Sequence, residues 1–246
     1  MKTVQVAIVT GASRGIGAEI AKHLARDGYQ VIVNYASNAA EADKVVQEIS
    51  SAGGKALAVK ANVADAGDVA ALFDAAEQAF GKVDVLINNA GVMPPELPML
   101  ADTDDKAFDT MMAINLKGTF NTLRQAARRM AQGGRIVNFS TSIVGLALPG
   151  YSIYGATKAA VETMSQIFAK ELRGRGIRVN VVAPGPTATA LFLDGKSPER
   201  IETLSKMAPL ERLGRPDDIA KTVSFLVGEQ SAWVNGQTLR VNGGIV

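Results

Sequence analysis

Short apolar runs and amphipathic stretches alternate along the chain. The apolar runs are rich in Val and Ile and nearly apolar on both faces, which is typical of a parallel sheet covered by helices on both sides. We expect strands over Val4–Val9, Gln30–Asn34, Ala56–Lys60, Val83–Ile87, Arg135–Phe139, Arg178–Val182 and Thr238–Val241.

The stretches between these runs predict helices over Gly15–Asp27, Ala39–Ser51, Ala66–Phe80, Asp104–Met130 and Ser152–Arg173. Strands that alternate with helices at this spacing form right-handed βαβ units. The pattern therefore predicts one α/β domain over residues 1–246, a Rossmann-like doubly wound parallel sheet of about seven strands with helices on both faces.

One proline-rich stretch, at about 186–215, interrupts this alternation after the sixth strand. Long insertions in compact domains are usually functional loops, and doubly wound sheets bind ligands beyond the carboxyl ends of their strands. We expect a substrate loop here.

Composition excludes several kinds of chemistry. Among 246 residues there is no Cys and one His, His23, and 26 Lys and Arg stand against 24 Asp and Glu. The missing thiols exclude disulfides, thiolate metal sites and a Cys nucleophile. A single His argues against a His-rich zinc site or a His-dependent triad, so no metal is expected. The net charge of +2 argues against nucleic-acid or membrane partners.

The N-terminus does not resemble a targeting segment. The apolar run Val4–Val9 is interrupted by Gln5 and is too short for a signal peptide. No stretch approaches the roughly 18 apolar residues of a membrane span. The expected location is cytoplasmic.

A glycine-rich turn follows the first strand and opens the first helix, with the spacing Gly-x3-Gly-x-Gly. Glycines allow a tight turn and let a pyrophosphate approach the N–H groups of a helix N-terminus. The alternative is an ordinary strand–helix turn that is rich in glycine. The expected contacts are Gly11, Ser13, Arg14, Gly15, Ile16 and Gly17.

The end of the second strand indicates the cofactor. A carboxylate there would bind the ribose hydroxyls of NAD, but Tyr35, Ala36 and Ser37 contain no acid. Arg14 could neutralise a 2′-phosphate, and Ser37 could donate a hydrogen bond to it. These residues favour NADP over NAD; the alternative is a solvated Arg14 in an enzyme that does not discriminate.

Tyr154 and Lys158 are four residues apart in a predicted helix, so both can face one site. A nearby ammonium favours the phenolate and lowers the pKa of a phenol, which would let Tyr154 exchange a proton with a carbonyl or alcohol oxygen. A surface Tyr–Lys pair is the alternative. Tyr151 is followed at the same distance by Gly155 and lacks a lysine.

Five features now stand in one order: the glycine turn, Asn88-Asn89-Ala90-Gly91, a serine ahead of Tyr154-x3-Lys158, that Tyr–Lys pair, and Pro184-Gly185. In this order and spacing the chain resembles the short-chain dehydrogenase/reductase family from Val4 to about Val246. It is most similar to the branch of 3-oxoacyl-[acyl-carrier-protein] reductases and bacterial carbonyl reductases.

The resemblance implies an NADPH-dependent reductase that transfers a hydride to a ketone, or oxidises the alcohol in reverse. Tyr154 would be the acid/base, and Lys158 would bind the nicotinamide ribose and lower the pKa of Tyr154. Asn115 would hold a water that links Lys158 to solvent. The resemblance also implies cofactor contacts at Asn62, Val63, Asn89, Ala90, Gly91, Pro184, Gly185, Thr187 and Thr189.

The family's catalytic serine falls among Ser140, Thr141 and Ser142. The family pattern of a serine, two small or apolar residues and a glycine selects Ser142, whereas counting back from Tyr154 points nearer Thr141. We assign Ser142, with a loop one residue shorter than usual before Tyr154, and expect Ser140 to be structural.

Several substrates fit. A 3-oxoacyl thioester on acyl carrier protein would need basic residues, for which Arg128, Arg129 and Arg175 are candidates, although Ala131–Gly134 departs from the basic character of carrier-binding relatives. A hydrophobic free ketone fits the apolar side chains of the insertion, Leu191, Phe192, Leu193, Met207 and Leu210, which could equally pack against another subunit. The alternatives are a sugar or polyol dehydrogenase and a catalytically silent NADP-binding regulator.

The family resemblance also implies a homotetramer built on the two long helices. Small residues there would let such helices approach closely, or could simply face the sheet. They are Ala126, Ala127, Ala156, Ala159 and Ala160, with Met164.

Overall fold

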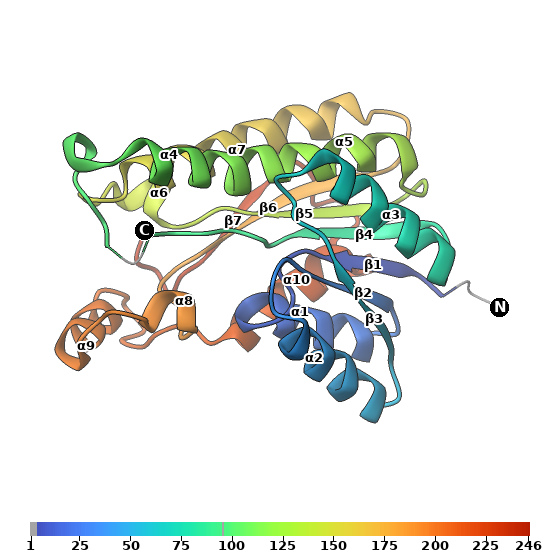
Figure 1. Cartoon of the computed structure of the whole chain (residues 1–246), viewed down its shortest axis with the longest axis horizontal. Coiled ribbons are helices and arrows are strands. Elements are labelled where there is room, and N and C mark those ends of the chain that lie inside the picture. The colour runs from blue at the N-terminus through green and yellow to red at the C-terminus, as the bar shows by residue number, and fades with distance from the viewer. Residues whose placement is uncertain (1–3, 95) are drawn as a thin grey trace.

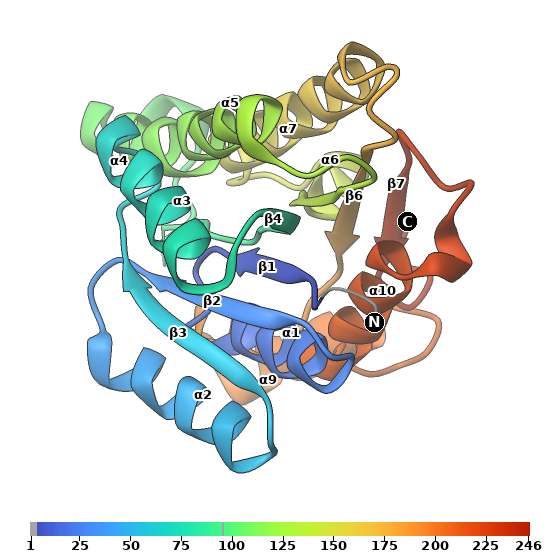
Figure 2. The same cartoon turned by 90° about the vertical axis from the view of Figure 1, so that its right-hand side faces the viewer.

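The computed structural model describes residues 4–94 and 96–246. Its sheet has seven parallel strands in the order β3-β2-β1-β4-β5-β6-β7, which Figure 2 shows from one edge to the other. The strands are β1 Val6–Val9, β2 Gln30–Tyr35, β3 Lys55–Lys60, β4 Val83–Asn88, β5 Arg135–Phe139, β6 Arg178–Pro184 and β7 Thr238–Val241. The predicted fold class is confirmed, and each strand end lies within two residues of the prediction.

Helices cover both faces of the sheet (Figure 1). One face carries α1 (Gly15–Arg26), α2 (Ala39–Ser51) and α10 (Pro216–Val227); the other carries α3 (Ala66–Phe80), α5 (Gly118–Arg129) and α7 (Ser152–Glu171).

Alternate residues of the central strands enter two separate cores. Val9 of β1 packs with α1 and α10, while its neighbour Ile8 packs with α3 and α5. In β2, Val33 enters the same core as Val9, and Ile32 enters the same core as Ile8. Because successive side chains of a strand point to opposite faces, a strand buried on both sides must be apolar throughout, as the sequence pattern indicated.

The predicted helix over Asp104–Met130 is not continuous. It consists of α4 (Asp105–Met111), a π-helical turn η2 (Met112–Lys117) and α5. Asn115 lies in η2, where its side chain bonds to both backbone groups of Val92. π-turns inside α-helices frequently occur at functional sites.

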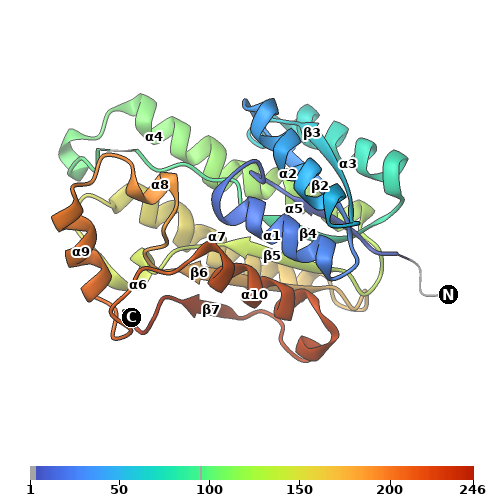
Figure 3. The same cartoon turned by 90° about the horizontal axis from the view of Figure 1, so that it is seen from below.

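The proline-rich stretch leaves the sheet and returns to it. Thr187 pairs with Gly214 in an isolated parallel bridge, and Gly214 N donates to Pro186 O at 2.8 Å, so the two ends of the excursion are joined. Between them lie two helices that the sequence pattern did not predict, α8 (Ala190–Leu193) and α9 (Pro198–Lys206). They stand beyond the carboxyl ends of the strands (Figures 1 and 3).

Three short elements complete the fold: η1 (Leu100–Asp102), α6 (Ile143–Leu146) and η3 (Glu229–Ser231). Among residues 4–94 and 96–246, no helix has the length and apolar character that a bilayer crossing requires.

The buried ring of Phe73 tests the packing of the core between the sheet and helices α3, α5 and α7. Phe73 of α3 is fully buried, whereas Phe225 of α10 is 40% exposed. We expect Phe73→Ala to lower the free energy of unfolding by about 3–5 kcal/mol, because the change removes buried apolar surface and leaves a cavity. Urea titration would measure the loss. Phe225→Ala is the matched control, and equal losses in the two variants would contradict the assigned packing.

Candidate active site

The glycine turn places backbone against backbone. Gly11 and Gly15 have φ of +61° and +59°, in the left-handed region that favours glycine. A Cβ on Gly17 would lie 2.4 Å from Gly11 O and 2.5 Å from Asn89 Nδ2. The turn therefore requires glycine both for its conformation and for its close packing.

Two side-chain amides hold this turn in place. Asn34 Oδ1 accepts a hydrogen bond from Gly11 N at 3.2 Å, while Asn34 Nδ2 donates to Ala61 O at 3.0 Å. Asn89 Nδ2 donates to Thr10 O and Gly11 O, each at 3.0 Å. Sequence reasoning did not single out Asn34, although a fully polar side chain in an otherwise apolar strand was a usable signal.

A groove runs from this turn across the ends of β2 and β3. Helix α1 begins there with no side-chain cap and no acidic residue in its first turn, so its N–H groups are available to an anion. These free donors and the glycine backbone fit a dinucleotide pyrophosphate. The groove is lined by every contact predicted from the turn to Gly91: Gly11, Ser13, Arg14, Gly15, Ile16, Gly17, Tyr35, Ala36, Ser37, Asn62, Val63, Asn89, Ala90 and Gly91.

The groove carries an uncompensated cation at the glycine turn. Arg14 and Ser37 line the groove together, and Arg14 makes no ion pair within the described part of the chain. The acid lining the same groove, Glu41, is paired with Lys44 at 2.7 Å. This charge arrangement fits an anionic group on the ribose better than a free ribose hydroxyl.

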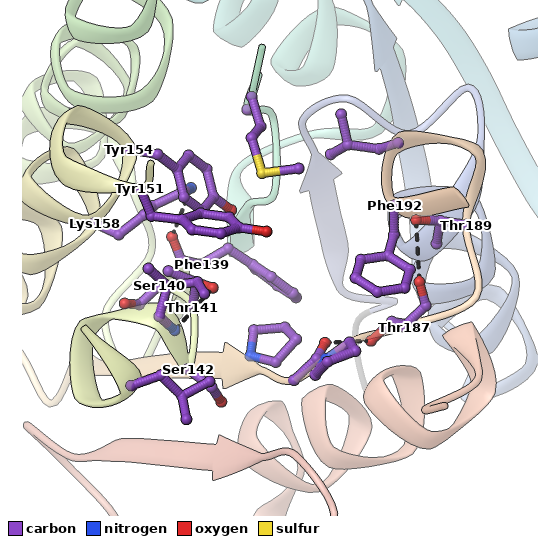
Figure 4. Close-up of a pocket in the computed structure, with 18 of the residues that line it drawn as sticks. Phe139, Ser140, Thr141, Ser142, Tyr151, Tyr154, Lys158, Thr187, Thr189 and Phe192 are labelled. Atoms are coloured by element: carbon purple, nitrogen blue, oxygen red, sulfur yellow. Dashed lines mark hydrogen bonds between the residues drawn. The ribbon is translucent and has the colours of Figure 1, made fainter. Parts of the chain in front are cut away.

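An apolar pocket adjoins the groove, and Ile16, Gly91 and Thr189 line both. Figure 4 shows the pocket between the hydroxyl-bearing segment after β5, the first turns of α7 and the α8 excursion. The remaining predicted residues that line it are Ser142, Tyr154, Lys158, Pro184, Gly185 and Thr187.

Lys158 is almost fully buried beneath Tyr154. Its Nζ donates to Phe139 O at 3.0 Å and lies 5.9 Å from the centre of the Tyr154 ring. Burial lowers the pKa of Lys158 from 10.5 to about 8, because removal from water disfavours the ammonium form.

Tyr154 is partly buried beside Lys158, and its pKa shifts in the opposite direction. Burial raises the pKa of Tyr154 from 10.0 to about 12, against a smaller lowering by a hydrogen bond from Thr141. The sequence analysis expected Lys158 to lower this pKa. In the structure, the effect of burial on this pKa is the largest, because burial disfavours the phenolate. Tyr154 is therefore protonated at neutral pH.

The three adjacent hydroxyls have three different partners. Ser140 Oγ donates to Glu162 Oε1 at 2.5 Å, in agreement with a structural role. Thr141 Oγ1 accepts from Ile143 N at 3.3 Å, and its hydroxyl lies close enough to Tyr154 to lower the pKa of that phenol. Ser142 Oγ donates to Ala183 O at 3.3 Å and accepts from Asn242 Nδ2 at 3.0 Å.

Asn115 does not line the pocket but supports it from behind. Its Oδ1 accepts from Val92 N at 2.8 Å and its Nδ2 donates to Val92 O at 2.9 Å. A Cβ on Gly91 would lie 3.3 Å from both Asn115 Oδ1 and Lys158 Nζ. Asn115 therefore fixes the backbone after β4 beside Lys158, and its expected water-holding role stays a prediction.

The apolar wall of the pocket was predicted in part. Leu191, Phe192 and Met207 line it, but Leu193 and Leu210 do not, and Leu210 is largely exposed. Sequence reasoning missed Leu204 of the same insertion and several apolar residues that reach the pocket from other segments. The latter include Met93, Leu146, Leu148, Tyr151 and Ile245.

Two of the three arginines considered for carrier binding are engaged within the chain. Arg129 pairs with Asp74 at 2.6 Å and Glu77 at 2.7 Å, and Arg175 donates to Met130 O at 2.7 Å. Arg129 ends α5, immediately before the amino end of β5, whereas the pocket lies beyond the carboxyl ends of the strands. Within one protomer these side chains do not border the site.

The burial of Lys158 predicts how the stability of the protein changes with pH. Between pH 8 and 10.5 the unfolded chain keeps the Lys158 proton that the folded chain releases, so stability rises with pH. We expect the free energy of unfolding of the wild type to increase relative to Lys158→Met across this window, as measured by urea titration at each pH. Lys170→Met, at an exposed lysine of the same helix, is the control. A constant difference between wild type and Lys158→Met would contradict the burial of charge.

Comparison with known proteins agrees with this geometry. A family model described as enoyl-(acyl carrier protein) reductase matches residues 11–246. The chain is 48% identical to a short-chain type dehydrogenase/reductase of Picea abies, over 98% of this chain and 92% of the relative. It is 46% identical to an NADPH-dependent aldehyde reductase-like protein, chloroplastic, of Arabidopsis thaliana (98% and 94%), and 42% identical to a 3-oxoacyl-[acyl-carrier-protein] reductase of Staphylococcus aureus (100% and 99%).

Solved structures agree as well. A short-chain dehydrogenase from Burkholderia cenocepacia in complex with NADP superposes with a TM-score of 0.92 at 35% identity, over 100% of this chain and 99% of that one. Since the family model and full-length relatives cover nearly all of the chain, the protein belongs to the short-chain dehydrogenase/reductase family, as the order of its motifs predicted.

Proposed function

We propose that the protein is an NADPH-dependent reductase that acts on a hydrophobic ketone, with Tyr154 as acid/base. One observation carries the proposal: Tyr154 and Lys158 line the apolar pocket, and Lys158 lies beside Gly91, which lines both this pocket and the groove of the glycine turn. The neighbour solved with NADP and the relative named as an NADPH-dependent reductase support the cofactor. When bound, NADPH supplies the hydride.

The side chains of this chain handle the proton. Tyr154 is protonated at neutral pH, so it can donate to a carbonyl oxygen that gains negative charge during reduction. Lys158, with a pKa of about 8, can exchange protons near neutrality and return one to Tyr154. Asn115 keeps the backbone beside Lys158 in place. We assign the proton path to these three residues.

The pocket wall favours an apolar substrate. Leu191, Phe192 and Met207, from the 186–215 insertion, offer hydrocarbon surface and no hydrogen-bonding groups for a sugar or polyol. We propose this insertion as the substrate loop. The engagement of Arg129 and Arg175 within the chain weakens the carrier-protein alternative, although a 3-oxoacyl thioester without its carrier also fits an apolar wall.

A silent NADP-binding regulator would need the groove but not the proton path. The buried Lys158 and protonated Tyr154 have no purpose in cofactor sensing alone, which favours the enzyme. NADPH oxidation with a panel of aryl ketones and acetoacetyl thioesters separates the two classes.

Assembly and location stay predictions. Phe120 and Ile167, on α5 and α7, are about half exposed and offer an apolar face for a second copy, whereas Ala126 is buried in the core and faces the sheet. A cytoplasmic location also stays a prediction, since one relative carries a chloroplastic name.

Removing the phenol oxygen tests the acid/base assignment. We expect Tyr154→Phe to lower kcat by about 10²-fold or more, the scale of general acid catalysis, and to change the Kd for NADPH only a few-fold. Steady-state kinetics and fluorescence titration would measure these values. Tyr29→Phe is the control, because it removes a hydroxyl that bonds to Val227 O at 3.4 Å. Near-wild-type turnover of Tyr154→Phe would refute the mechanism.

Removing the free cation tests cofactor choice. We expect Arg14→Ala to raise the Kd for NADPH by about 10-fold or more, because a hydrogen bond to a charged group contributes about 1.5–3 kcal/mol, and to leave the Kd for NADH within a few-fold. Arg26→Ala, at the other end of α1, is the control. Equal effects on both cofactors would argue against 2′-phosphate binding by Arg14.

A further inference from the structure

The segment after β5 presents Ser140, Thr141 and Ser142 beside the pocket, and their surroundings separate their roles. We propose that Thr141, rather than Ser142, is the second hydroxyl that binds the substrate oxygen beside Tyr154. This inference rests on the proposed reductase function and specifies its site.

The backbone turns Ser142 away from Tyr154. Ser140 N donates to Val182 O at 2.8 Å and Ser142 N donates to Pro184 O at 2.9 Å, so both residues continue the pairing of β5 with β6. The Ser142 side chain then contacts Ala183 O of β6 and Asn242, which follows β7. Figure 4 shows Ser142 apart from Tyr154, with Thr141 between them.

The hydrogen-bond capacity of Ser142 is already used. A hydroxyl has one proton to donate, and Ser142 gives it to Ala183 O while accepting from Asn242. The side chain is 2% exposed. To donate to a substrate oxygen, Ser142 would have to withdraw its proton from Ala183 O.

Thr141 has the opposite arrangement. Its Oγ1 accepts from Ile143 N at 3.3 Å, so its one proton can be given on the side of the pocket, where the hydroxyl lies close enough to Tyr154 to lower the pKa of that phenol. A carbonyl oxygen placed within reach of Tyr154 is therefore within reach of Thr141 as well. The β-branch of threonine restricts its side-chain rotation, which keeps the hydroxyl directed at that point.

Ser142 instead holds the pocket wall. Asn242 Nδ2, its hydrogen-bond donor, also donates to Val246 O at 3.2 Å, and Ile245 between them lines the pocket. Loss of the Ser142 hydroxyl should loosen this wall and raise KM, whereas loss of the Thr141 hydroxyl should lower kcat.

Three variants test the inference, with NADPH and the aryl ketone that the wild type reduces fastest. We expect Thr141→Val, which keeps the side-chain volume, to lower kcat by about 10²–10³-fold, the loss typical of one oxyanion donor. Thr141→Ser should recover kcat to within about tenfold of wild type. Ser142→Ala should change KM more than kcat. A greater kcat loss in Ser142→Ala than in Thr141→Val would overturn the inference.

Turnover of the wild type separates the two ways in which the inference can fail. Absence of wild-type turnover with every carbonyl, beside tight NADPH binding, would count against the reductase function. Wild-type turnover with the order of the kcat losses reversed would count against Thr141 alone.

Discussion

The glycine turn after β1 depends on hydrogen bonds from its two neighbouring strands. Asn34, in β2, binds Gly11 N, and Asn89, just after β4, binds the carbonyls of Thr10 and Gly11. The Thr10 hydroxyl in turn accepts from Asn89 N. Because the strand order reverses between β1 and β4, a crevice opens at this point. These amides fix the floor of the crevice through contacts within the chain, and this floor is the proposed pyrophosphate site.

A second constraint is the burial of an ionisable pair at the end of β5. Lys158 Nζ donates to one backbone group, Phe139 O, among the described residues, and burial lowers its pKa while it raises that of Tyr154. Both shifts have one cause, removal from water, and both favour the neutral form of the group. Packing alone therefore gives these side chains the pKa shifts on which their proposed roles, proton donor and proton exchanger, depend.

Local patterns predicted the sheet because strands such as β2 and β5 are apolar on both faces, and they predicted the turn because Gly11, Gly15 and Gly17 form a short motif. They did not predict η2, because that turn accompanies bonds from Asn115 to Val92, 23 residues away. They also missed α8 and α9, which are only 4 and 9 residues long, and α10 (Pro216–Val227). Ser142 and Thr141 could not be separated, since their difference lies in contacts with Asn242 and Tyr154.

The chemistry and the choice of substrate are carried by different parts of the molecule. Tyr154, Lys158 and Thr141 stand on α7 and at the end of β5, elements held by the sheet. Part of the wall that faces them comes from α8, α9 and Ile245, which lie outside the sheet. Changes in this part of the wall need not alter the proposed proton path. Family membership therefore identifies the chain as an oxidoreductase, whereas the substrate has to be argued from the apolar side chains that line its pocket.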